Sequence, residues 1–173
     1  LIIAIVIRLT SSGPSLYGQE RMGLDGLTFN ALKFRSMHYD AESETGAVWA
    51  SENDERRTKI GTFLRKYSLD ELPQLFNVLK GEMSLVGPRP ERPEIDVDLS
   101  NQIPFYNTRY TLKPGLSGWA QVNYPYGASI RDASIKLSYD IFYLLNFSFF
   151  LDILIAIKTF KLVLFAKGSI PKK

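Results

Sequence analysis

The sequence has no cysteine and only one histidine, His38. Without cysteine the chain cannot form a disulfide scaffold, a thiolate zinc site or a cysteine nucleophile. A single imidazole excludes metal sites built from several histidines, and no pattern typical of a Ser–His–Asp triad surrounds His38. The nucleotide-binding loops G-x-x-x-x-G-K-[ST] and G-x-G-x-x-G are also missing. Carboxylates, lysines and arginines are therefore the groups left for chemistry.

Composition and charge narrow the class of protein further. With 45% hydrophobic and 13% aromatic residues the 173-residue chain is not of the disordered type, and its length suits one domain. A net charge of +3 gives no argument for nucleic acid as a partner. Residues 141–173 hold five lysines and one acid, Asp152, so this apolar end carries +4 and residues 1–140 carry −1. Such a segment is typical of a surface that meets anionic lipid, and equally of a core helix with solvated lysines.

The start of the chain is apolar from Leu1 to Ile7 and is closed by Arg8. Seven residues are too few to cross a bilayer, which takes about 20 in a helix. Neither a basic leader nor a small-residue cleavage site marks a signal peptide. We therefore expect residues 1–9 to be the end of a longer N-terminal membrane helix.

A second apolar segment, residues 141–166, has 20 apolar residues out of 26, which is long enough for a membrane span. Asp152, Lys158 and Lys161 argue against a span, because each charge near the bilayer centre costs about 2.5–3.5 kcal/mol. A helix that lies in the membrane interface, or packs on the domain, costs less. We expect residues 141–173 to form such interfacial helices.

Hydrophobic periodicity predicts an α+β fold that is mostly helical with a small β-hairpin. Together with the apolar, basic C-terminal segment, this makes a membrane-associated α+β fold the expectation. The hairpin lies within residues 16–37, at the turn Asp25–Gly26. No repeating βαβ pattern indicates a doubly wound sheet. The polar residues 41–59 predict a surface loop, and three prolines exclude regular structure in residues 84–93. Apolar residues recur at helical spacing in residues 60–67, 72–79, 94–112 and 132–166. In the last of these segments a break is expected at residues 146–148.

Asp70 and Glu71 stand side by side in the segment Ser68–Leu75, S-L-D-E-L-P-Q-L. One interpretation is a capping box, in which Ser68 and Glu71 cap a helix. Pro73 favours another, because proline suits the first position of a helix better than its interior. The two acids would then lie just ahead of the helix, where they could share a divalent cation or divide the roles of nucleophile and metal ligand.

Several cations occur in settings that suit phosphate groups. Prolines on both sides of Arg89 stiffen its backbone, which lowers the entropy lost when its guanidinium grips a phosphate. Lys33 and Arg35 share one face if their segment is a strand, and this spacing suits a diphosphate. Arg109 belongs to a basic, turn-rich patch with residues 113–118. Each of these features, taken alone, is equally typical of a solvated surface.

Taken together and in order, these segments resemble the bacterial sugar transferase family, the monotopic phosphoglycosyl transferases. The resemblance covers nearly the whole chain. The matching motifs are K-F-R-[ST]-M at residues 33–37, D-x-R-x-T-x-x-G-x-x-L-R at 54–65, S-x-D-E-L-P-Q-L at 68–75, N-V-L-x-G-[DE]-M-S-L-V-G-P-R-P at 77–90, P-G-[IL]-[ST]-G-x-A-Q-V-N at 114–123 and Y-D-x-x-Y-x-x-N at 139–146. The family carries an N-terminal membrane helix that re-enters its own leaflet, and residues 1–9 resemble only the end of it.

The resemblance implies an enzyme that transfers a sugar-1-phosphate from a nucleoside diphosphate sugar, usually a UDP-sugar, to polyprenyl (undecaprenyl) phosphate and releases UMP. It implies Asp70 as the nucleophile of a covalent aspartyl-phosphosugar intermediate and Glu71 as its metal-binding or positioning partner. Mg²⁺, held by these two acids, is the implied cofactor. Contacts to substrate phosphates are implied for Lys33, Arg35, Arg65 and Arg89, and a place in the nucleotide and structural shell for Arg109 and Asp140.

On this interpretation residues 10–140 are the catalytic domain, docked on the cytoplasmic face of the bacterial inner membrane, where it begins polysaccharide and glycoconjugate assembly. Two alternatives stay open. One is a membrane-associated glycosyltransferase that releases UDP, with Asp70 or Glu71 as a base. The other is a non-enzymatic membrane-surface module whose acids only cap a helix. The sugar, the polyprenol length and the choice between a monomer and a homodimer cannot be read from the sequence.

Overall fold

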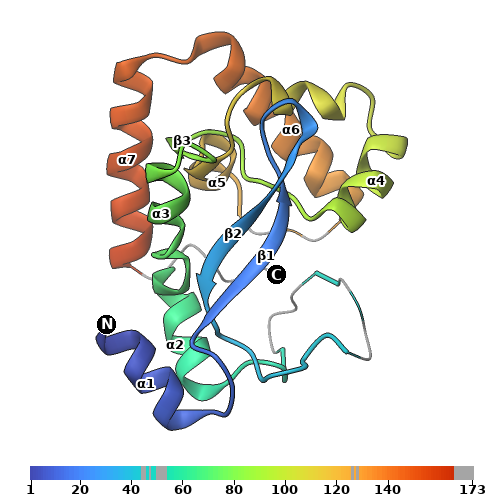
Figure 1. The fold of residues 1–173 in the computed structure, drawn as a ribbon. Helices are drawn as coiled ribbons and strands as arrows, with labels where there is room; N and C mark the ends of the chain where they lie inside the picture. Colours follow the sequence, from blue (N-terminus) through green and yellow to red (C-terminus); the bar gives the residue numbers. More distant parts are fainter. Residues whose placement is uncertain (44–45, 47, 50–53, 126, 128, 166–173) are drawn as a thin grey trace.

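The computed structural model describes residues 1–43, 46, 48–49, 54–125, 127 and 129–165 and has the expected mostly helical α+β fold (Figure 1). Its helices are α1 (Ile2–Thr10), α2 (Lys59–Lys66), α3 (Gln74–Leu79), α4 (Pro93–Gln102), α5 (Trp119–Asn123), α6 (Ile130–Asn146) and α7 (Phe149–Leu164). The strands are β1 (Leu16–Met22), β2 (Thr28–Phe34), β3 (Ser84–Val86) and β4 (Gly115–Ser117). Short 3-10 turns are η1 (Leu24–Gly26), η2 (Leu69–Glu71) and η3 (Tyr106–Thr111). The surface loop expected at 41–59 lies partly outside the described residues, at 44–45, 47 and 50–53.

The β1–β2 ribbon runs through the middle of the molecule, with α3 and α7 on one side of it and α4 on the other (Figure 1). The two strands are antiparallel, and Met22 pairs with Thr28 at the closed end. In the connecting turn Asp25 and Gly26 both have positive φ, a geometry that aspartate tolerates and glycine favours. The predicted hairpin is thus confirmed.

A side chain of α3 closes the outer edge of β2. Buried Asn77 accepts a hydrogen bond from the backbone N–H of Leu32 and donates one to the carbonyl of Asn30. The amide takes the place of a neighbouring strand and satisfies backbone groups that an edge strand leaves unpaired. This contact sets α3, and the two acids in front of it, against the middle of β2.

Strands β3 and β4 pair in parallel, so the prediction of irregular structure for residues 84–93 is wrong at its start. Glycines make this pairing possible. A β-carbon on Gly87 would lie 2.5 Å from the carbonyl oxygen of Lys113, and one on Gly115 would lie 2.1 Å from the backbone nitrogen of Gly87. Because the partners are far apart in the sequence, no local pattern predicts the pair. The strand β3 leads directly into the loop that carries Arg89.

The long C-terminal helices confirm the periodicity argument. α6 ends at Asn146, and α7 begins at Phe149, where Ser148 accepts a capping hydrogen bond from the N–H of Leu151. The break expected at 146–148 is therefore present. The other predicted helices appear as α2, α3 and α4 with η3. The main core cluster consists of Leu99, Ile103, Tyr106, Tyr110 and Leu137.

Helix α7 buries Ile155, directs Asp152 and Lys158 to partners within the protein and exposes mainly apolar residues. Lys158 donates to the side-chain oxygen of Asn123 and lies over the ring of Trp119, while Asp152 accepts a hydrogen bond from Tyr143. Lys158 is thus used inside the protein, which corrects the expectation that it meets solvent or lipid. Lys167, Lys172 and Lys173 lie outside the described residues. The outer face of α7 consists of Phe149, Phe150, Ile153, Leu154, Ile157, Phe160, Lys161 and Leu164.

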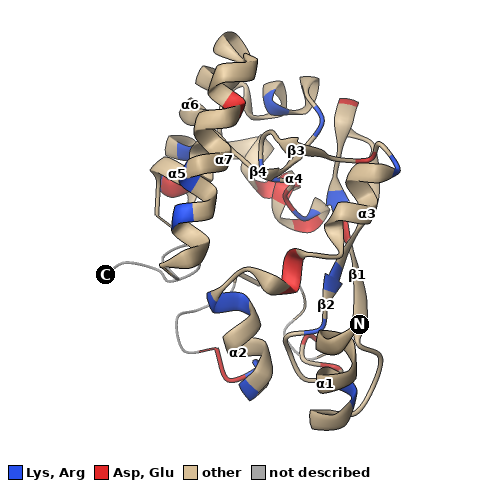
Figure 2. Cartoon of the chain, turned by 90° about the vertical axis from the view of Figure 1, so that its left-hand side faces the viewer, with Lys and Arg blue, Asp and Glu red and all other residues tan. Residues whose placement is uncertain are grey.

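Two more helices expose apolar side chains near this face. In Figure 1 the helices α1, α3 and α7 lie toward the same side of the molecule, and Figure 2 shows α3 without a charged residue. The exposed residues of α1 and of the α3 region are Leu1, Ile2, Ile5, Leu9, Leu72, Leu75, Phe76 and Leu79. Within the described ranges, none of the helices has the length and apolarity needed to cross a membrane.

Candidate active site

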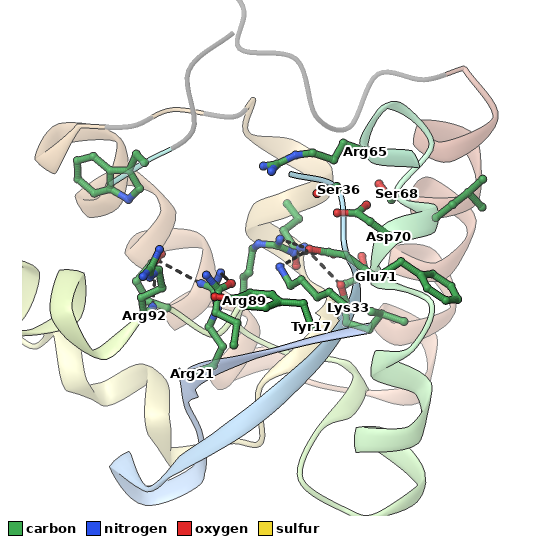
Figure 3. Close-up of a pocket in the computed structure, with 18 of the residues that line it drawn as sticks. Tyr17, Arg21, Lys33, Ser36, Arg65, Ser68, Asp70, Glu71, Arg89 and Arg92 are labelled. Carbon is green, nitrogen blue, oxygen red and sulfur yellow. Dashed lines mark hydrogen bonds and ion pairs between the residues drawn. The ribbon is translucent and has the colours of Figure 1, made fainter. Parts of the chain in front are cut away.

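Asp70 and Glu71 lie in the turn η2, just ahead of α3, as the interpretation based on Pro73 predicts. Ser68, directly before the turn, has a φ of 54°, in the left-handed region that residues with side chains rarely adopt. Its side chain makes no capping hydrogen bond, and the carboxylate of Glu71 points elsewhere, so the capping-box interpretation is wrong. The turn instead presents both carboxylates to a cavity (Figure 3).

Helix α2 fixes this turn against the end of the ribbon. Its first turn is capped by Thr58, whose hydroxyl accepts a hydrogen bond from the N–H of Gly61. A β-carbon on Gly61 would lie 1.8 Å from the carbonyl oxygen of Ser36, so only glycine allows this close approach. Arg65, on the last turn of α2, lines the cavity, and Figure 3 shows it beside Asp70.

Glu71 forms a partly exposed ion cluster with two cations. Lys33 of β2 donates to Oε1 of Glu71 at 3.1 Å, and the guanidinium of Arg89 donates to both carboxylate oxygens, to Oε2 at 3.1 Å. Burial alone would raise the pKa of Glu71, but the charges of Arg89 and Lys33 outweigh it and hold the pKa well below its usual range. Burial also lowers the pKa of Lys33 to about 8, although Glu71 opposes the shift. Glu71 is therefore ionised at neutral pH and fixes both cations on the cavity wall.

Asp70 lies beside this cluster, yet its carboxylate has no partner among the residues that the structure describes. It is 7% exposed and forms no hydrogen bond or ion pair with another residue in the described part of the chain. Burial, followed by the charge of Glu71, raises the pKa of Asp70, while nearby cations oppose the shift. A carboxylate with unused lone pairs among cations is suited to attack an electrophile or to bind a metal ion.

Arg109 and Asp140 lie behind the loop that carries Arg89. Nη2 of Arg109 is 2.9 Å from the carboxylate of Asp140 and 2.7 Å from the carbonyl oxygen of Arg89. Nη1 of Arg109 donates to the hydroxyl of Tyr106 at 2.6 Å. Both side chains touch the cavity, but the terminal nitrogens of Arg109 and the carboxylate of Asp140 are engaged within the protein. Nε of Arg109 is buried and has no hydrogen-bond partner among the described residues.

Arg35 is placed differently from the expectation. Lys33 and Arg35 were expected to share a strand face, but β2 ends at Phe34, so Arg35 lies just beyond the strand. The guanidinium of Arg35 donates to backbone carbonyls of residues 11–14, in the segment that follows α1. Because its donors are committed to the backbone, the structure favours a structural role for Arg35 over a phosphate contact.

All eight residues expected at the site line one cavity of about 1010 Å³. Five of them are labelled in Figure 3, namely Lys33, Arg65, Asp70, Glu71 and Arg89. Sequence reasoning missed further polar residues of this wall, among them Tyr17, Arg21, Arg92 and Lys136. Tyr17 and Arg21 alternate on one face of β1, and Tyr17 pairs directly with Lys33. Strand alternation would have found both once the register was known, whereas no local pattern marks Arg92 or Lys136.

A bound Mg²⁺ would have to be held by carboxylates of the cavity wall. The described residues contain no group of three or more acids and histidines that could hold a metal ion. Mg²⁺ keeps several waters and is often bound through one or two carboxylates together with substrate phosphates. The unpartnered carboxylate of Asp70 fits such a site. Glu71 is already engaged by Lys33 and Arg89, which favours a positioning role for Glu71 over metal binding.

The sequence matches the family model described as bacterial sugar transferase over residues 1–166. The chain belongs to the bacterial sugar transferase family. Each of the motifs that resemble this family contributes residues to the one cavity, and the Asp70–Glu71 pair lies on its wall.

Three bacterial sugar transferases illustrate the relationship. The chain is 45% identical over 169 residues to the UDP-N-acetylgalactosamine-undecaprenyl-phosphate N-acetylgalactosaminephosphotransferase of Aeromonas hydrophila, with 98% of this chain and 40% of the relative covered. It is 43% identical over 161 residues to the UDP-glucose:undecaprenyl-phosphate glucose-1-phosphate transferase of Xanthomonas campestris pv. campestris, with 92% of this chain and 33% of the relative covered. For the enzyme with the same name from Caulobacter vibrioides the identity is 42% over 161 residues, with 92% of this chain and 60% of the relative covered. The chain thus spans only part of each relative.

Proposed function

We propose that this bacterial sugar transferase moves a sugar-1-phosphate from a UDP-sugar to polyprenyl (undecaprenyl) phosphate and releases UMP, with Asp70 as the nucleophile. The observation that carries the proposal is the unpartnered carboxylate of Asp70 in a cavity lined by cations. The relatives support the substrate class, since their names contain a UDP-sugar and undecaprenyl phosphate.

In the first proposed step a carboxylate oxygen of Asp70 attacks the phosphorus that bears the sugar. The bond between this oxygen and phosphorus forms, the bond to the bridging oxygen of the diphosphate breaks, and UMP leaves with the electron pair. In the second step a phosphate oxygen of polyprenyl phosphate attacks the same phosphorus and releases the carboxylate of Asp70. The products are UMP and a polyprenyl diphospho-sugar. One carboxylate thus serves an aqueous and a lipid substrate in turn.

The cations of the cavity reduce the repulsion between a carboxylate and a diphosphate. Lys33 and Arg89 are held in place by Glu71, and Arg65 lies beside Asp70 (Figure 3). Phosphoryl transfer depends mainly on such positioning and charge stabilisation, with little need for a histidine base. Mg²⁺ bound by Asp70 and the substrate phosphates would neutralise further charge on the diphosphate.

Membrane docking is part of the proposal, because one substrate is a lipid. The outer face of α7 is apolar apart from Lys161, and Phe160 and Val163 of the same helix also line the cavity. A helix with an apolar outer face and an inner polar face is suited to the membrane interface. We place this face on the cytoplasmic side of the bacterial inner membrane. Phe150 and Ile157 are both exposed, and the double variant Phe150→Ser/Ile157→Ser should float less with phosphatidylglycerol vesicles than the wild type does. Unchanged flotation would contradict the docking.

The test of the reaction is Asp70→Asn, which keeps the shape of the side chain and removes its charge. The wild type is incubated with UDP-glucose or UDP-N-acetylgalactosamine, undecaprenyl phosphate and Mg²⁺. We expect UMP release and a covalent phosphosugar on the protein, measured by intact mass, and neither product with Asp70→Asn. Asp98→Asn, at an exposed position of α4, is the matched control.

Other outcomes identify the alternatives. UMP release by Asp70→Asn near the wild-type rate would contradict the nucleophile assignment. Release of UDP in place of UMP would indicate a glycosyltransferase that moves the sugar alone. No turnover of either nucleotide sugar by the wild type would favour a non-enzymatic module on the membrane surface.

A further inference from the structure

The loop of residues 88–91 is held from outside by a donor on each of its four backbone carbonyls. The contacts are Gly115 N–H to Pro88 at 2.9 Å, Arg109 Nη2 to Arg89 at 2.7 Å, Arg21 Nη1 to Pro90 at 3.1 Å and Met22 N–H to Glu91 at 2.9 Å. Two of these four donors are arginine side chains. An arginine that spends a donor on a backbone carbonyl fixes the course of the chain at that point.

Both terminal nitrogens of Arg109 are engaged within the protein, and its Nε is buried with no hydrogen-bond partner among the described residues. Its two terminal nitrogens contact Asp140, the carbonyl of Arg89 and the hydroxyl of Tyr106, and its guanidinium lies 5.1 Å from the Tyr106 ring centroid. The side chain of Arg109 is 8% exposed and that of Asp140 is 2% exposed. Such a buried charge is tolerated because the carboxylate compensates it.

Unlike Arg109, Arg89 has a guanidinium that is directed to the reacting site, while its backbone carbonyl is held from behind. Its carbonyl is tied to Arg109, while its guanidinium reaches Glu71 beside the unpartnered Asp70. The Arg89 side chain is 41% exposed, so it is accessible from the cavity. A shift of its backbone therefore moves the guanidinium relative to Asp70.

We infer that Arg109, supported by Asp140, is a positioning residue that aims Arg89 at the reacting phosphate. The inference rests on the proposed sugar-1-phosphate transfer. It narrows the expected place of Arg109 and Asp140 in the nucleotide and structural shell to that of a tether, which acts through the backbone of Arg89. Misplacement of a reacting group by about 1 Å can lower a rate by about 10²-fold.

The test is a double-mutant cycle between Arg109→Lys and Arg89→Lys, read as UMP release. A lysine cannot bridge Asp140 and the Arg89 carbonyl as a planar fork does. We expect Arg109→Lys to lower kcat by about 10–100-fold with KM for the UDP-sugar changed by less than about 3-fold. In the Arg89→Lys background the same change should cost less than about 3-fold. Arg131→Lys, exposed on α6, is the control and should leave kcat unchanged.

Losses that multiply in the double variant would overturn the inference, because they indicate that Arg109 acts independently of Arg89. A large rise in KM alone would overturn it in favour of a direct substrate contact. Asp140→Asn, which keeps an acceptor for Arg109, is the second variant if Arg109→Lys does not fold, and the same coupling to Arg89→Lys is expected.

A measurement without turnover separates this inference from the proposed function. The ¹⁵N signal of Arg89 Nε in NMR spectra should shift in Arg109→Lys and stay in place in Arg131→Lys. An unshifted signal would overturn the positioning role even in an active enzyme. A shifted signal in a protein that turns over no UDP-sugar would support the tether and contradict only the proposed reaction.

Discussion

The Glu71 cluster (Lys33, Glu71 and Arg89) and the Arg109 cluster (Arg109 and Asp140) meet at one residue. The first uses the guanidinium of Arg89, and the second uses its backbone carbonyl. Exposed fractions separate them: 41% and 14% for the Arg89 and Glu71 side chains, against 8% and 2% for Arg109 and Asp140. The more open cluster faces the cavity, while the closed one supports it.

The difference shows what burial of charge does in this molecule. In the Arg109 cluster the charges bind one another and the backbone, so the cluster holds the fold together. In the Glu71 cluster the cations are fixed but accessible, and an unpartnered Asp70 lies beside them. Chemistry is therefore expected where the charges are left incompletely paired, and stability where the pairing is closed.

The largest effect is expected from Asp140→Ala in the closed cluster. Arg109 would remain buried without its carboxylate, and breaking a buried ion pair in this way costs about 3–5 kcal/mol. The free energy of unfolding, measured by urea denaturation, should fall by that amount. A loss below about 1 kcal/mol would mean that the Arg109 cluster contributes little to the stability of the fold, which would contradict its structural role.

Glu71→Gln should act in the opposite way and affect rate more than fold. The neutral amide leaves Lys33 and Arg89 without the charge that fixes them, so kcat for UMP release should fall by about 10²–10³-fold. The melting temperature should stay close to that of Glu20→Gln, a control at an exposed position of β1. A large loss of stability with little loss of rate would contradict the division between the clusters.

The pH dependence of kcat/KM should show two limbs that belong to the open cluster. Asp70 must be ionised to attack, and because burial raises its pKa the acid limb should lie above the ordinary aspartate value of about 3.9. Lys33 loses its charge as pH rises through its pKa of about 8, so the rate should fall about tenfold per pH unit above that value. Lys33→Arg, which does not titrate in this range, should remove the alkaline limb. A flat profile from pH 7 to 9.5 in the wild type would exclude this role of Lys33.

The smallest effect is expected at Asp96, next to the closed cluster. Its Oδ1 is buried without a hydrogen bond, and burial raises its pKa to about 6 although Arg109 opposes the shift. A carboxyl with a raised pKa in the folded state loses stability as pH rises from about 4 through 6. Asp96→Asn should therefore be more stable than the wild type by about 1–3 kcal/mol at pH 7.5 and equal to it at pH 4. Equal unfolding free energies at both pH values would contradict this.

Local signals predicted the elements whose causes are local. The hairpin turn, the helix break at 146–148 and the place of the two acids ahead of α3 were all readable from a few neighbouring residues. Only the structure could decide whether Ser68 caps a helix or precedes a turn. A serine in the left-handed region cannot be told from a helix-capping serine by sequence. The positively charged tail lies partly outside the described residues, and its membrane contact stays a prediction.

Features that join distant segments were not predictable. The β3–β4 pair depends on Gly87 and Gly115 meeting backbone to backbone, and the commitment of Arg35 to residues 11–14 depends on where β2 ends. Arg21 was missed because its role appears only when its guanidinium meets the carbonyl of Pro90. Motif resemblance found the site residues, but only the structure separates those that face the cavity from those that hold it.

The amide of Asn77 has a consequence for hydrogen exchange. The backbone N–H of Leu32 is protected by the side chain of Asn77 and not by another strand, so its exchange requires α3 to leave β2. The same separation pulls the Asp70–Glu71 turn away from Lys33, the residue that follows Leu32. The exchange rate of a single amide proton therefore reports how often the cation cluster comes apart in solution.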